Sequence, residues 1–254
     1  MKPRKAKKQF SMTTPLQELW FLWLVKYSEM CDCAEIDAKK LAAPFFSNAP
    51  EQGRSPVIMY VGKATARGWY KDQFAECMGL SREDRVAERH KRTKEWVDAL
   101  SSGEQHKSGF WIFATKLNNI AAMTPETCSS LSHIVWSNVA KIGRIDGNPR
   151  GIYFEKQKEL AVRTLKAEIE TYQPALVHFA SWDDCDTAVI DALVDDGGER
   201  SWDKTGNSKG IWRRPSYASL PPLVWTEHPQ GKDRDKWSLW LNKVREMLTS
   251  GANA

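Results

Sequence analysis

Short apolar runs that alternate with amphipathic segments are the feature that most limits the fold of this chain. Four runs, rich in Val, Ile, Leu and aromatic residues, have the length and composition of strands, and they cover residues 57–62, 134–137, 175–181 and 223–229. Because strands that lack polar alternation are buried on both faces, they favour a mostly parallel sheet between helices. We therefore predict an α/β three-layer sandwich with a central, mostly parallel sheet.

Helical patterns fill the intervals between these strands. Apolar residues recur at helical spacing in six segments, at about 16–29, 81–100, 110–121, 154–173, 184–194 and 237–248. Ser81 is a candidate N-cap for the second segment, and Pro174 ends the fourth. A chain of 254 residues with 41% hydrophobic residues can build one sizeable core. We expect a basic flexible tail over 1–12 and a single domain over 13–250.

The excess of positive charge is concentrated in the tail. The first twelve residues hold five basic residues and no acid: Lys2, Arg4, Lys5, Lys7 and Lys8. Without them, 32 basic and 32 acidic residues remain, so the body of the chain has no net charge. A polyanion would therefore be bound by the tail and by local patches. A solubilising leader that makes no such contact is the alternative for the tail.

Cysteine usage and hydropathy indicate the cellular compartment and argue against a metal site and a membrane span. The five cysteines are scattered and odd in number, which is typical of a reducing compartment, and we expect a cytoplasmic protein. Cys31 and Cys33 lack a second pair at metal-ligand spacing, so we predict no metal site. The sequence contains no run of 18 apolar residues, so it predicts no membrane span. The basic N-terminus also lacks the apolar segment of a secretory signal.

Polar side chains follow the predicted strands at their carboxyl ends, where ligands bind in sheets of this class. Gly62 closes the first strand, Asn138 comes directly after the second, and His228 and Pro229 close the last. Each residue alone has a structural interpretation, since Asn caps turns and His is often buried in a core. Their shared position at one edge of the sheet favours a functional site.

Three segments in this order resemble the motifs of the uracil-DNA glycosylase superfamily: "YVGKATARGW", "WSNVAKIGRIDGNPR" and "VWTEHPQ". The resemblance spans about residues 56–248. It implies a monomeric DNA glycosylase without a cofactor, which flips a base out of the helix and hydrolyses its N-glycosidic bond. Some branches of the family bind an iron–sulfur cluster through a cysteine whose position holds Ile142 here, so no cluster is expected.

The resemblance also implies roles for single residues. The Asn138 amide would read the edge of the flipped base, because it offers both a donor and an acceptor. His228 would donate a hydrogen bond to the departing base as negative charge grows on it. The family usually carries Asp or Asn two residues after the first-motif glycine, where this chain has Ala64. Three alternatives are therefore open. Another carboxylate activates the water, with Asp72, Asp146 and Glu227 as candidates and Asp72 as our catalytic candidate; or the DNA phosphates and the departing base mainly stabilise the oxocarbenium; or hydrolysis is lost.

Two larger sets of residues complete the predicted site. The first motif and the aromatic residues after it would bind the base, and the set is Gly62, Lys63, Ala64, Thr65, Trp69, Tyr70 and Phe74. Basic, polar and aromatic residues would contact DNA, and they are Arg67, Lys141, Trp212, Arg213, Arg214, Gln230 and Lys232. Residues 200–214 combine five basic residues and one acid with two tryptophans, which suits a loop that grips phosphates. A surface loop anchored by tryptophans is the alternative.

In the family that the chain resembles, the first-motif side chains help to exclude larger bases, so the resemblance implies an enlarged base pocket around Ala64. This favours a pyrimidine with a bulky 5-substituent, such as the glucosylated hydroxymethylcytosine of some phage DNAs, and hence a role in antiphage defence. Three alternatives stay open: a uracil-DNA repair glycosylase, a non-catalytic DNA-binding module on the same fold, and a nucleoside or nucleotide hydrolase.

Overall fold

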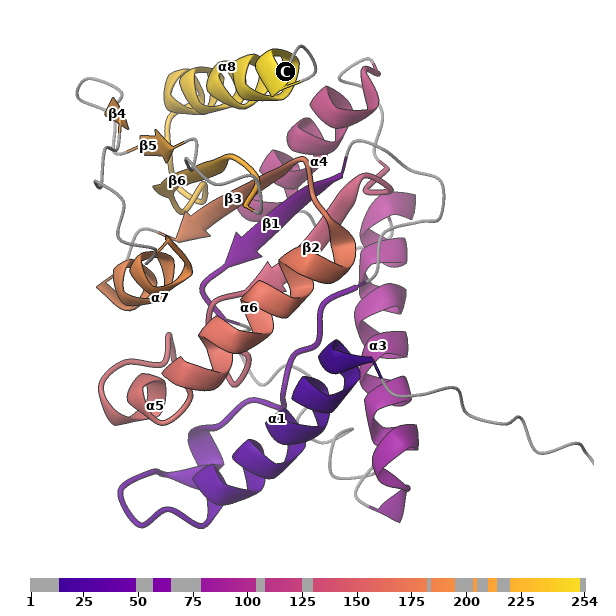
Figure 1. The fold of residues 1–254 in the computed structure, drawn as a ribbon, viewed down its shortest axis with the longest axis vertical. Helices are drawn as coiled ribbons and strands as arrows, with labels where there is room; N and C mark the ends of the chain where they lie inside the picture. Colours follow the sequence, from indigo (N-terminus) through magenta and orange to yellow (C-terminus); the bar gives the residue numbers. More distant parts are fainter. Residues whose placement is uncertain are drawn as a thin grey trace, which may run out of the picture.

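The structure, a computed structural model, contains a six-stranded sheet in the order β2-β1-β3-β6-β5-β4. It describes residues 14–48, 57–64, 79–103, 108–124, 130–181, 184–194, 203–204, 210–213 and 220–251. The parallel strands are β1 (Ile58–Gly62), β2 (Ile134–Asn138), β3 (Leu176–Ser181) and β6 (Leu223–Glu227). The antiparallel strands β5 (Gly210–Arg213) and β4 (Asp203–Lys204) extend one edge (Figure 1). The predicted mostly parallel sheet is confirmed.

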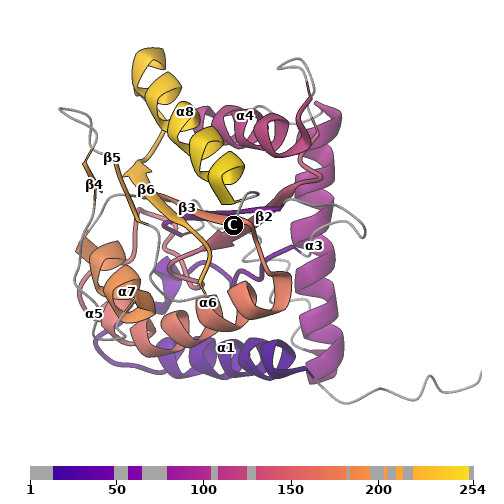
Figure 2. The same ribbon diagram turned by 45° about the horizontal axis from the view of Figure 1, so that its top comes forward.

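Helices cover both faces of this sheet (Figures 1 and 2). One face carries α4 (Gly109–Ala122) and α8 (Arg234–Gly251), while the other carries α6 (Lys158–Tyr172) and α7 (Asp184–Val194). Three further α-helices and a short 3-10 helix (Ala38–Lys40) complete the described part: α1 (Pro15–Cys31) packs on α6, α3 (Arg82–Ser102) stands along the side of the sandwich, and α5 (Ile152–Glu155) precedes α6. The three-layer prediction is therefore confirmed.

The apolar runs are continuous because both faces of each strand are buried. In β1, Tyr60 belongs to the core under α4 and α8, while Met59 and Val61 belong to the core under α6 and α7. All five residues of β1 and all five of β2 are buried. A polar alternation would have placed a polar side chain in one of these two cores. Among the described helices, none is long and apolar enough to cross a membrane.

The helix ends follow local signals, and two segments differ from their predicted secondary structure. Ser81 Oγ accepts a hydrogen bond from the Asp84 N–H at 3.1 Å, which confirms the N-cap of α3. The segment predicted as one helix over 154–173 is divided into α5 and α6. Gln157 lies between them, where its side-chain amide bonds both the N–H and the C=O of Ile142. In the segment 200–214, predicted as a loop, the described residues form β4 and β5.

Candidate functional site

A cavity of about 460 Å³ opens at the carboxyl edge of the parallel strands. The residues that line it come from the ends of β1, β2 and β6, from the start of α4, and from α3, and they are Gly62, Lys63, Ala64, Trp96, Ser108, Phe110, Trp111, Trp136, Asn138, Asn148, His228 and Gln230. Six predicted site residues meet here: Gly62, Lys63, Ala64, Asn138, His228 and Gln230. They meet because parallel strands bring their carboxyl ends to one edge.

Asn138 occupies the floor of the cavity. It is the last residue of β2, pairs in register with Gly62 of β1, and is only 2% exposed. A Cβ atom at Gly62 would lie 2.7 Å from Asn138 Oδ1 and 3.3 Å from the Phe110 ring, so only glycine leaves room for the amide. Within the described residues, the buried Asn138 Nδ2 has no hydrogen-bond partner. A buried donor of this kind is costly unless a ligand supplies the acceptor.

His228 presents a neutral imidazole. The Gln230 N–H donates to its Nδ1 at 3.2 Å, so in the neutral ring the proton is on Nε2. Burial, together with the nearby positive charges of Lys63 and Lys232, lowers the pKa of His228 to about 4. The ring stacks on Phe110 with centroids 5.4 Å apart. At neutral pH the side chain is therefore a hydrogen-bond donor through Nε2 without carrying a charge.

Aromatic rings form the walls. Phe110 also stacks on Tyr60 at 4.4 Å, and Trp111 meets the edge of Trp136 at 4.7 Å. The start of α4 reaches this place because Gly109 has no side chain: a Cβ atom there would lie 3.0 Å from Gln230 Cα. The sequence-based prediction did not assign these aromatics to the site. The glycine directly before the Phe-Trp pair is the signal that a close approach of the backbone was needed.

The carboxylates predicted as alternatives for water activation are held elsewhere. Glu227 accepts hydrogen bonds from Lys232 at 3.0 Å and Lys236 at 3.3 Å. Burial opposes its ionisation, but the two lysines bring the net pKa of Glu227 below its ordinary value. Asp146 pairs on the surface with Arg144 at 2.8 Å. No Asp or Glu lines the cavity in the described ranges.

The prediction that Lys141 contacts DNA is wrong. Its side chain is fully buried beneath β2, where Nζ donates to Glu168 Oε1 at 2.8 Å and to Ser137 Oγ at 2.6 Å. From this position the ammonium group cannot reach a phosphate. On α3, Arg89 is buried in a similar way, since it is 1% exposed and its Nε donates to the Pro44 carbonyl at 3.0 Å.

Several predicted site residues are not tested by these contacts. Those outside the described residues are Thr65, Arg67, Trp69, Tyr70, Asp72, Phe74 and Arg214, together with the tail. Trp212 and Arg213 belong to β5, where only the backbone pairing with β4 and β6 is described. Lys232 is partly exposed and paired with Glu227.

Neither metal ligands nor known relatives add to this description. Over the ranges that the structure describes, no group of three or more His, Cys, Asp or Glu side chains could hold a metal ion. No model of a known protein family matches the chain, and no curated protein sequence matches it at a significant level. The geometry of the cavity, together with the motif resemblance, is therefore the basis for a functional proposal.

Proposed function

We propose that the protein is a DNA glycosylase, which hydrolyses the N-glycosidic bond of a modified pyrimidine and leaves an abasic site. The observation that carries the proposal is the meeting of a buried amide, Asn138, and a neutral imidazole, His228, in one cavity with aromatic walls. An extrahelical base needs these three elements: polar groups for its edge, a ring to stack on, and a donor for the oxygen that gains charge.

The chemistry follows from the two polar groups. As the glycosidic bond breaks, its electron pair moves to the departing base, and the sugar becomes oxocarbenium-like. His228 Nε2–H donates to the base oxygen that gains negative charge, while Asn138 holds the base edge. Ser108 and the first turn of α4 line the same cavity, and the positive end of the helix dipole favours that charge. Water then adds to the anomeric carbon and its proton is transferred to the base.

The size of the cavity supports a substituted base. A volume of about 460 Å³ is typical of pockets that hold drug-sized ligands, which exceed a bare pyrimidine ring. Ala64 and Lys63 lie on the same wall region, where a larger side chain than Ala would fill space. The substrate we propose is glucosylated hydroxymethylcytosine, which would give the protein a role in antiphage defence. Uracil, in a repair role, is the competing substrate.

A second candidate function is a DNA-binding module that holds an extrahelical base without cleaving the bond. The observation that favours it is the lack of a carboxylate among the described cavity residues. Asp72, outside the described residues, is the remaining sequence-based candidate for water activation. Tight, base-dependent binding without base release would identify this function.

The test compares duplexes that carry one uracil, one hydroxymethylcytosine or one glucosylated hydroxymethylcytosine. Abasic sites are measured as alkali-induced strand breaks. His228→Ala should lower base release about 10²- to 10³-fold, the scale for the loss of one such donor, while duplex affinity stays unchanged. His228→Gln, which keeps an N–H donor, should recover part of the rate. Full activity in His228→Ala would refute the assigned role, and preference for uracil would refute the bulky substrate.

A further inference from the structure

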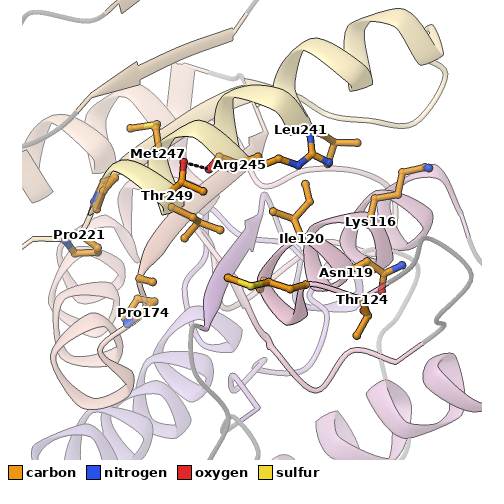
Figure 3. Close-up of a pocket in the computed structure, with 15 residues that line it drawn as sticks. Lys116, Asn119, Ile120, Thr124, Pro174, Pro221, Leu241, Arg245, Met247 and Thr249 are labelled. Atoms are coloured by element: carbon orange, nitrogen blue, oxygen red, sulfur yellow. Dashed lines mark hydrogen bonds between the residues drawn. The ribbon is translucent and has the colours of Figure 1, made fainter. Parts of the chain in front are cut away.

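A second cavity lies at the amino edge of the parallel strands, away from the candidate site. It has a volume of about 880 Å³ and lies between α4 and α8, above the segments that lead into β3 and β6 (Figure 3). Ile120 comes from α4, Leu241 and Leu248 come from α8, and all three are partly buried against the core. The cavity shares no lining residue with the candidate site.

Three prolines line the side of this cavity next to the sheet, which we call its floor. Pro174 precedes β3, and Pro221 and Pro222 precede β6, at the points where the chain enters the sheet. Proline has no backbone N–H, so these positions offer ring carbons in place of donors. Water in a space bounded by such groups finds few partners. An apolar ligand that replaces it gains the free energy of apolar burial.

The charged side chains that line the cavity are both positive. Lys116 comes from α4 and Arg245 from α8, and no carboxylate is among the described lining residues. Figure 3 shows Arg245 extending from α8 toward the side where Ile120 and Lys116 lie. One guanidinium nitrogen, Nη1, donates to Asn242 Oδ1 at 2.8 Å, while a guanidinium carries five N–H donors in all. The entrance therefore complements an anion, while the floor complements an apolar group.

We propose that this cavity binds a small amphiphilic anion, with its apolar body over the proline floor and its carboxylate or sulfonate beside Arg245 and Lys116. Charge complementarity favours an amphiphilic anion over a neutral apolar ligand, because a neutral ligand would not interact with the charges of Arg245 and Lys116. The volume lies within the range of small-molecule sites. The proposal is independent of the glycosylase function, since it involves another edge of the sheet.

The experiment titrates the 254-residue chain with anilinonaphthalene sulfonate, which combines fused apolar rings with one sulfonate. We expect a saturable rise in fluorescence that dodecanoate reverses and acetate does not. Arg245→Leu, combined with Lys116→Met, keeps the apolar walls and removes both charges. Its affinity for the probe should fall about tenfold, the scale for the loss of charge-assisted contacts, while binding of the uncharged dye Nile red is retained.

The matched control is Arg163→Leu, which removes an exposed arginine from α6 on the opposite face of the sheet. The affinity of this variant for the probe should equal that of the unmodified chain. Ile120→Trp, which enlarges one lining side chain and occupies part of the cavity, should weaken binding of both dyes, with a cooperative thermal transition as the check on folding. An equal loss in Arg163→Leu, unsaturable binding, or no displacement by dodecanoate would overturn the proposal.

Discussion

The buried ion pair beneath β2 offers the sharpest test of the energetics of this fold. Lys141 and Glu168 are both 0% exposed, and Lys141 Nζ lies 2.8 and 2.9 Å from the two carboxylate oxygens. Burial lowers the pKa of Lys141, whereas the adjacent Glu168 carboxylate raises it and favours the charged form. Ser137 Oγ donates to Glu168 at 2.7 Å. Each charge is therefore stabilised mainly by the other two groups.

Removing one partner should leave an uncompensated charge in the core. We expect Glu168→Leu or Lys141→Met to lower the free energy of unfolding by about 3–5 kcal/mol, the scale for breaking a buried pair. Changing both, Lys141→Met with Glu168→Leu, removes both charges and should recover most of this loss. The remaining deficit should be about 1 kcal/mol, because the Ser137 hydroxyl loses its partners.

Urea unfolding at pH 7, followed by tryptophan fluorescence, measures these differences. With a slope of about 2 kcal/mol/M, a loss of about 4 kcal/mol moves the midpoint by about 2 M. The exposed pair Lys94–Asp98, at 2.6 Å with side chains 70% and 58% exposed, is the matched control. Lys94→Met should cost less than about 1 kcal/mol. Single core variants that cost no more than this control, or a double variant as unstable as the sum of the single ones, would refute the reasoning.

Three further perturbations test the site, the pH dependence and the tail. Gly62→Ala places a Cβ atom 2.7 Å from Asn138 Oδ1 and should lower base release about 100-fold, whereas Gly79→Ala, which meets no atom within 4 Å, should have no effect in the same assay. Burial lowers the pKa of His178 to about 3, so protonation favours the unfolded chain. The neutral His178 contributes stability that is fully present above about pH 6.5 and is lost as the pH falls, by about 2 kcal/mol between pH 7 and pH 5. Urea titrations at these two pH values should show that the free energy of unfolding of His178→Gln falls by about 2 kcal/mol less than that of the unmodified chain. Deleting residues 2–8 should weaken DNA binding at low salt and flatten its salt dependence, because fewer counterions are released, and an unchanged slope would mean that the tail is only a leader.

Local patterns in the sequence were sufficient for the architecture. Apolar runs without alternation predicted strands buried on both faces, and the Ser81 cap fixed the start of α3. The meeting of Asn138 and His228 was also predictable, because both follow parallel strands whose carboxyl ends share one edge. These inferences depend on period, on capping and on a general property of parallel sheets.

Other features depended on partners that are distant in the sequence. Lys141 reads as a surface lysine in a basic loop, yet it turns inward because Glu168, on α6, lies beneath the end of β2. Phe110 reads as one residue of a helical stripe, and it reaches the cavity because Gly109 allows α4 to contact Gln230 after β6. Local propensity determines which elements form, whereas the direction of a side chain at the end of an element depends on what the rest of the chain packs against it.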